Sequence, residues 1–191
     1  LHIGTVEENI QGDLKQMNKV RIGWELPTEL KVFNKEKGEQ PCVISKEFTL
    51  SLSEKANLRK MLASWRGKDF SPKEAESFDI TKLIGVPCML NIIHKPAKDG
   101  SRHYEEIGSV SPMPKGMDCP AQVNATSILD YDKFNKNLFD SLPDFIKLKI
   151  QTSDEYKAMI NAGVEAKHEE DEKEEAGVET AEAGTSKELP F

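Results

Sequence analysis

Lysine, arginine and aromatic side chains recur along the predicted strands and in the loops that join them. These residue types bind unpaired nucleic acid, because cations follow the phosphates and rings stack on the bases, each stacked base contributing about 1–3 kcal/mol. The candidates for these contacts are Lys19, Arg21, Trp24, Phe33, Lys46, Lys95, Arg102 and Tyr104. The alternative is that the cations are ordinary solvated surface charges, since the part of the chain that carries them is neutral overall.

The two tryptophans also have a competing role as core residues. Trp24 alternates with Val20 and Ile22 on one strand face, which favours the core and leaves base stacking as the alternative. Trp65 lies on the apolar stripe of a predicted helix, so we expect it in the core.

Groups that would perform catalysis or hold a metal do not form a recognisable pattern. The sequence lacks a GxxxxGK[ST] loop, an HExxH motif, paired CxxC motifs and a GxSxG elbow. Glu105 and Glu106 are adjacent on a predicted strand, so their carboxylates point to opposite faces and cannot share a proton. The histidines are scattered, at positions His2, His94, His103 and His168. We therefore expect neither an enzyme nor a cofactor or metal, and an enzyme with an unrecognised site is the least favoured alternative.

The negative charge of the chain is concentrated at one end. The 191 residues have a formal net charge of −7, and residues 164–191 alone hold ten acidic and three basic side chains. Residues 1–163 therefore carry 23 acids and 23 bases and are neutral. High charge and low hydrophobicity predict that the segment from residue 161 onward is disordered.

Cysteine usage indicates a reducing compartment, and hydropathy indicates no membrane-spanning helix. Cys42, Cys88 and Cys119 are odd in number and widely spaced, which is typical of free cytosolic thiols. No apolar run approaches the ~18 residues of a membrane-spanning helix, so we expect a soluble, cytoplasmic protein. The first residues, "LHIGT", read like a strand already under way, which leaves open that further sequence precedes Leu1.

The periodicity predicts five strands with a helix between the third and the fourth. A period of two places the strands at residues 1–6, 16–27, 41–52, 86–95 and 101–113, and residues 28–40 read as a flexible hairpin loop. An amphipathic helix follows Ser53 as N-cap and ends at Gly67, and a capping box at Ser71–Glu74 opens a shorter one. Two further short helices are predicted at 141–150 and 152–160.

This order of elements is that of the OB-fold, a five-stranded Greek-key barrel of the all-β to α+β classes. Gly23 and Gly108 lie where a bend or bulge would ease closure of the barrel. The alternative is another small α+β sheet protein. The expected organisation is an OB-fold nucleic-acid-binding domain over 1–116, a linker with short helices that pack on it over 117–160, and an acidic tail over 161–191.

The end of the chain, "KELPF", resembles the tail of bacterial single-stranded DNA-binding proteins, in which an OB-fold is joined to a flexible acidic tail with a Pro-Phe tip. Residues 20–116 also resemble a group of phage-encoded proteins assigned as single-stranded DNA-binding proteins. The matching stretches are "VRIGWELP", "FTLSLSEKANLRKMLASWRGKDF", "LIGVPCMLNIIH" and "SVSPMPKG".

The resemblance implies sequence-tolerant binding of single-stranded DNA during phage replication or recombination, in the cytoplasm of a bacterial host. Partner-binding would fall to Leu189, Pro190 and Phe191, with Phe191 in an apolar pocket of the partner and its carboxylate on an arginine or lysine. The implied partners are helicases, primases, nucleases or recombination mediators, and a homo-oligomer is compatible with the sequence. Lys187 and Glu188 depart from the continuous acidic run that is usual before the tip.

A protein-interaction adaptor is the alternative function from another class. In that hypothesis the OB-like body has no primary role with nucleic acid, and the helices between Phe134 and Ile150 form the docking surface.

Overall fold

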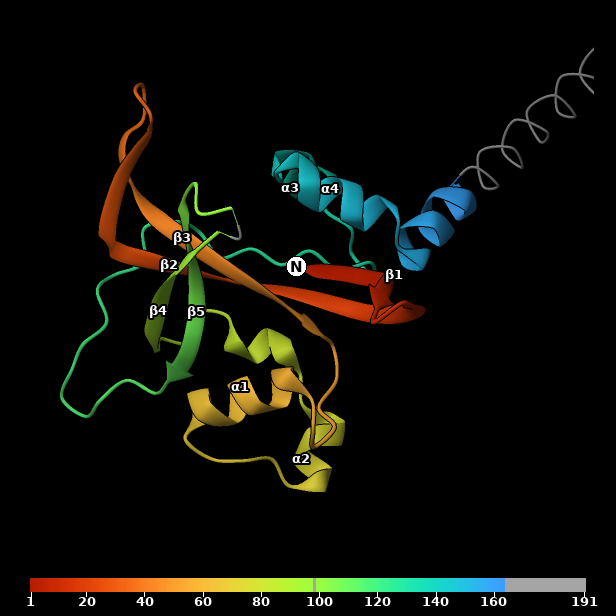
Figure 1. Ribbon diagram of the computed structural model, residues 1–191, viewed down its shortest axis with the longest axis horizontal. Helices are drawn as coiled ribbons and strands as arrows, with labels where there is room; N and C mark the ends of the chain where they lie inside the picture. Colours follow the sequence, from red (N-terminus) through yellow and green to blue (C-terminus); the bar gives the residue numbers. More distant parts are fainter. Residues whose placement is uncertain (98, 164–191) are drawn as a thin grey trace, which may run out of the picture.

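The computed structural model describes residues 1–97 and 99–163. Figure 1 shows two antiparallel sheets with short helices against them. The larger sheet has the order β1-β2-β3, and the smaller one pairs β4 with β5. The strands are β1 (His2–Ile10), β2 (Asp13–Asn34), β3 (Gly38–Thr49), β4 (Met89–Pro96) and β5 (His103–Ser111). The mixed α+β class and the order of the elements are therefore as predicted.

The helices follow the third strand and the fifth strand. Between β3 and β4 lie α1 (Asn57–Arg66), α2 (Pro72–Ser77) and the 3-10 helix η1 (Ile80–Leu83). After β5 come α3 (Lys136–Ser141), α4 (Asp144–Gln151) and helical residues 154–163. Both helices predicted near the C-terminal end of the described chain are thus present.

Helix α1 is confirmed, but it begins later than its sequence signals indicate. Its N-cap is Ala56, which has no capping side chain, so the prediction of Ser53 as N-cap is wrong. Its C-terminal end at Gly67 is as predicted, with a left-handed φ of 67° that glycine adopts without strain. The predicted capping box of α2 is also present, because the Ser71 side chain accepts from Glu74 N and the Glu74 carboxylate accepts from Ser71 N.

One hydrophobic core joins both sheets to α1. The apolar stripe of α1 buries Leu58, Leu62 and Trp65, because these residues recur on one helix face. Trp24 of β2 is buried against this stripe, with its ring centroid 5.9 Å from that of Trp65. The other buried members of this core are Val20, Phe48, Phe70, Ile107 and Val110.

A second core joins β1 to the segment after β5. Ile3 and Val6 of β1 are buried against a cluster from the C-terminal part of the described chain. That cluster consists of Leu129, Phe139, Ile146 and Ile150. Residues after 128 are therefore an integral part of the fold.

The hairpin between β2 and β3 is longer than the sequence predicts. Residues 28–40 were expected to form a flexible loop, but β2 continues to Asn34 and β3 begins at Gly38. The pairing register shifts between Leu26 and Leu30 and again between Val32 and Asn34. Each shift moves side chains to the other face, which hides the period of two. We call residues 27–41 the β2–β3 arm, and Figure 1 shows it projecting beyond the rest of the larger sheet.

The expected five-stranded barrel does not close among the residues that the structure describes, because its strands form two separate sheets. The strand edges that closure would join make other contacts. At the free edge of β1, His2 N donates to Leu129 O at 2.8 Å, and Thr5 N donates to Glu155 Oε2 at 2.6 Å. The C-terminal segment thus takes an edge that barrel closure would need. Between β3 and β5, the Lys46 side chain donates to Ile107 O at 2.8 Å, without a strand ladder.

Of the two glycines expected to ease closure, only one accompanies a bulge. The register of β4 and β5 shifts opposite Gly108, where an added Cβ would lie 2.5 Å from Ile93 Cδ1. Gly23 pairs in regular register with Ser45, so no bulge occurs there.

Candidate nucleic-acid interface

Lys19 and Arg21 lie on the outer face of β2, and carboxylates neutralise both of them. Lys19 Nζ is 2.6 Å from Glu8 Oε2, and the Lys19 side chain is only 11% exposed. Arg21 Nη2 is 3.4 Å from Glu47 Oε2, and Nη1 donates to Ser45 Oγ at 3.0 Å. Neither cation is free to meet a phosphate in this arrangement.

Lys149 of α4 joins these pairs into one network. Its Nζ lies 2.8 Å from Glu8 Oε1 and 2.5 Å from Glu47 Oε1. Burial acts to raise the pKa of Glu8, but hydrogen bonds from Lys149 and a second lysine outweigh it and hold the pKa below its usual value. Burial also acts against the charge of Lys149, but its two carboxylate partners keep its pKa above the usual value.

The C-terminal segment covers more of the same sheet face. The Arg21 guanidinium carbon lies 5.5 Å from the centre of the Phe145 ring. The Glu25 carboxylate accepts from Val123 N at 2.7 Å and from Asn124 N at 2.8 Å. The outer face of β2 around Arg21 and Glu25 therefore contacts the protein's own chain.

Three of the predicted site residues come together between β3 and the β4–β5 hairpin. Lys95 Nζ lies 2.5 Å from Glu106 Oε2, and Lys46 Nζ lies 3.6 Å from Glu106 Oε1. Tyr104 is directly opposite Lys95 in the ladder, so their side chains share a face. The hydrogen bond with Lys95 and its charge hold the pKa of Glu106 below its usual value. The cluster of Lys46, Lys95 and Glu106 thus keeps one net positive charge beside the Tyr104 ring.

The remaining predicted residues divide between core and surface. Trp24 is buried and offers no ring face to a ligand. Phe33, on the β2–β3 arm, is 67% exposed, and Tyr104 is 46% exposed. Arg102 is exposed at the turn of the β4–β5 hairpin. In both figures the β2–β3 arm and the turn of the β4–β5 hairpin project away from α1 and α2.

Sequence reasoning missed a groove where α1, β3 and the bulge of β5 meet. It has a volume of about 400 Å³, and Lys46 and Lys60 line it from two sides. Its other lining residues are Phe48, Asn57, Met61, Ser64, Ile107, Gly108, Ser109 and Val110. No carboxylate lines it. Gly108 was the only signal in the sequence, because a glycine in a strand marks a bulge or a close approach.

An apolar patch on α4 is the second exposed feature of note. Phe145 is 62% exposed and Leu148 is 63% exposed. Leu148 also lines a shallow depression of about 490 Å³, together with Phe139, Asp140, Asp144, Lys147 and Gln151. This patch lies within the helices that the adaptor hypothesis names.

Neither a membrane-spanning helix nor a metal-binding cluster occurs among the described residues. None of their helices combines the length and the apolar character needed to cross a bilayer. Within residues 1–97 and 99–163, no group of three or more His, Cys, Asp or Glu side chains could hold a metal ion. The predicted partner-binding residues Leu189, Pro190 and Phe191 lie outside the described residues.

Comparison with known proteins gave no match to any family model, to a curated protein or to a solved structure. The resemblance to single-stranded DNA-binding proteins therefore stays a prediction.

Proposed function

We propose that this protein binds single-stranded DNA, in a sequence-tolerant manner, through the β4–β5 hairpin and the β2–β3 arm. The observation that carries the proposal is the half-exposed ring of Tyr104 beside Lys95, with Arg102 at the turn of the same hairpin. Such a combination provides a stacking surface next to cations that can follow phosphates. Phe33 offers a second exposed ring on the β2–β3 arm.

This proposal moves the interface away from the face of β2 that carries Lys19 and Arg21. Both cations are already paired with carboxylates, and a phosphate would have to displace Glu8 or Glu47 to reach them. Separating or desolvating such ion pairs costs free energy unless the new contacts with the phosphate compensate for it. Lys95 on the β4–β5 hairpin is also paired, with Glu106, but its side chain is 45% exposed, against 11% for Lys19 and 19% for Arg21, so a phosphate can approach it from solvent.

We further propose that the fold is an open relative of the OB-fold. Three features support this: the order of the elements, the packing of α1 beneath both sheets, and the facing edges of β3 and β5 that Lys46 bridges. The outward hairpins would then correspond to the loops with which OB-folds hold unpaired strands.

In this proposal the protein works in phage replication or recombination and recruits partner proteins through Leu189, Pro190 and Phe191. Sequence alone supports this part, namely an acidic segment followed by an apolar tip. Flexible acidic segments of this kind can bring an apolar anchor to a basic rim on a partner.

The test is a fluorescence anisotropy titration of labelled oligo-dT at low salt. Replacing Tyr104 by alanine should weaken binding by about 5- to 150-fold, which corresponds to the loss of one stacked base. Phe145→Ala is the control, because it removes an even more exposed ring, on α4 rather than on a hairpin, and should leave the affinity unchanged.

Three results would count against single-stranded DNA binding at the hairpins. The first is no binding of oligo-dT at low salt, and the second is equal affinity for duplex DNA. The third is an equal loss in both alanine variants, which would place the interface elsewhere or indicate a general loss of structure.

An interaction adaptor is the second candidate, favoured by the exposed pair Phe145 and Leu148 on α4. Apolar side chains that stay exposed on one helix face often mark protein contacts. A pull-down from nuclease-treated lysate separates the two functions. An adaptor keeps its partners when DNA is removed, and it loses them when Phe145 and Leu148 are both replaced by serine. A DNA-binding protein loses its DNA-bridged partners on nuclease treatment alone.

A further inference from the structure

We propose that the groove between α1, β3 and β5 binds the phosphate backbone of the same unpaired strand that stacks on Tyr104. This inference rests on the proposed function and adds to it a second contact region, whose main cation is Lys60. The groove borders the β5 bulge at Gly108 and Ser109, on the strand that also carries Tyr104.

The groove is rich in hydrogen-bond donors, and none of its lining residues is acidic. A lysine has three donors, and Lys46 directs its ammonium group to Ile107 O and Glu106. Lys60 is exposed and forms no ion pair within the described part of the chain. The Asn57 amide and the Ser109 hydroxyl add neutral donors. In a body that is neutral overall, a site with two lysines and no lining carboxylate is suited to an anion.

Lys60 differs in this respect from the arginines of the same helix. Arg59 binds Asp69 at 3.0 Å and donates to Phe70 O at 2.7 Å. Arg66 binds Glu74 at 2.8 Å, and its guanidinium carbon lies 4.1 Å from the centre of the Phe70 ring. These arginines hold the turn between α1 and α2 in place. Lys60 has no comparable structural contact, so it is available for a ligand.

An extended peptide is a poorer occupant than a phosphate backbone. A peptide strand would bind by pairing with the free edge of β5. The carbonyls that this edge directs toward the groove are already satisfied, Ile107 O by Lys46 at 2.8 Å and Val110 O by Ser64 Oγ at 2.6 Å. Blocking an edge with side chains in this way prevents strand addition. A phosphate accepts hydrogen bonds from the lysines and needs no ladder.

The groove and the Tyr104 ring are a suitable distance apart for one strand to reach both. Five residue steps separate Tyr104 from Ser109 along β5, which is about 16 Å at the usual strand rise. That length corresponds to about five nucleotides at the spacing of a stacked strand. The ammonium group of Lys46 lies between them, where it meets Ile107 O and Glu106. The combined path matches the usual site size of about 4–16 nucleotides for one OB-fold.

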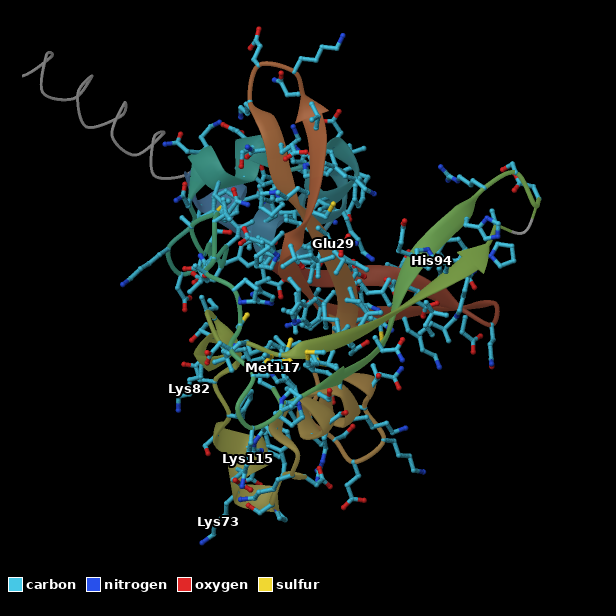
Figure 2. All side chains as sticks on the ribbon, turned by 90° about the vertical axis from the view of Figure 1, so that its left-hand side faces the viewer. Glu29, Lys73, Lys82, His94, Lys115 and Met117 are labelled. Atoms are coloured by element: carbon cyan, nitrogen blue, oxygen red, sulfur yellow. The ribbon has the colours of Figure 1, made fainter. Side chains whose placement is uncertain are left out.

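The decisive experiment measures how the affinity for oligo-dT depends on salt in Lys60→Met. Removing one phosphate contact should make the slope of log K against log salt shallower by about 0.7. Lys73→Met is the matched control, since Lys73 lies on α2 outside the groove and points away from the body in Figure 2. Its slope should equal that of the unmodified protein.

A second readout separates this inference from the proposed function. In an NMR titration with oligo-dT, the amide signals of Asn57, Gly108 and Ser109 should shift together with that of Tyr104, and Lys60→Met should suppress only the first group. If Tyr104 shifts while the groove does not, or the slope is unchanged in Lys60→Met, the groove proposal is wrong and the hairpin interface stands. If oligo-dT shifts no signal, both are wrong.

Discussion

Replacing Ile150 by alanine tests whether the C-terminal helices are part of the fold or a loose appendage. Ile150 is 0% exposed and lies in the core between β1 and α4, beside Ile146 and Phe139. The substitution removes three buried carbon atoms. At about 0.8 kcal/mol each, their transfer to water costs about 2.4 kcal/mol. The remaining cavity raises the expected loss of unfolding free energy to about 3–4 kcal/mol.

Leu148→Ala is a closely matched control. Leucine and isoleucine are isomers, the two positions are two residues apart in α4, and Leu148 is 63% exposed. A truncation at such a surface position should change the free energy of unfolding by less than about 0.5 kcal/mol. Comparison of the two variants therefore cancels the effects of side-chain size and of the helix itself.

Urea denaturation with two probes gives the measurement. Both tryptophans of the chain, Trp24 and Trp65, lie in the other core, so their fluorescence reports the β-sheets and α1 alone. Circular dichroism at 222 nm also reports the C-terminal helices. Because Lys149 links α4 to Glu8 of β1 and to Glu47 of β3, we expect one cooperative transition and the same shift with both probes. Equal stability of Ile150→Ala and Leu148→Ala, or a fluorescence transition that does not move in Ile150→Ala, would refute the single cooperative fold.

Two further predictions concern ionisable groups. At the edge of β1, hydrogen bonds to the Glu155 carboxylate outweigh its burial and lower its pKa. This carboxylate therefore stabilises the fold at pH values above its unfolded pKa of about 4.3. The stabilisation is lost as the pH falls through the lower pKa of the folded state. Glu155→Gln should therefore be less stable than the unmodified protein at pH 7 in urea denaturation, and the difference should shrink as the pH falls below the unfolded pKa; a difference that stays constant over this acidic range would contradict this role. Burial and the nearby Cys119 raise the pKa of the Cys88 thiol to about 11, whereas Cys119 is exposed. Mass spectrometry after iodoacetamide treatment at pH 8 should find Cys119 modified in the native protein and Cys88 only in urea, and rapid native labelling of Cys88 would contradict its burial.

Local periodicity determined much of the architecture. The alternation of Val20, Ile22 and Trp24 identified β2 and the inward face of Trp24, and the stripe containing Leu58 and Leu62 identified α1. The glycine at 108 marked the bulge of β5. Each of these features depends on a repeat or a backbone conformation encoded by neighbouring residues, so the sequence alone sufficed.

Only the tertiary structure decided what each charged side chain contacts and which strand edges remain free. The sequence marks Arg21 as a surface cation. In the structure, however, Glu47 forms an ion pair with Arg21 and also binds Lys149, which lies 102 positions further along the chain. Likewise Glu155 reaches β1 from 150 residues away and takes an edge that a closed barrel would use. A periodic pattern reports which face of an element is apolar. It does not report which distant element packs there, because that choice depends on the packing of the whole chain.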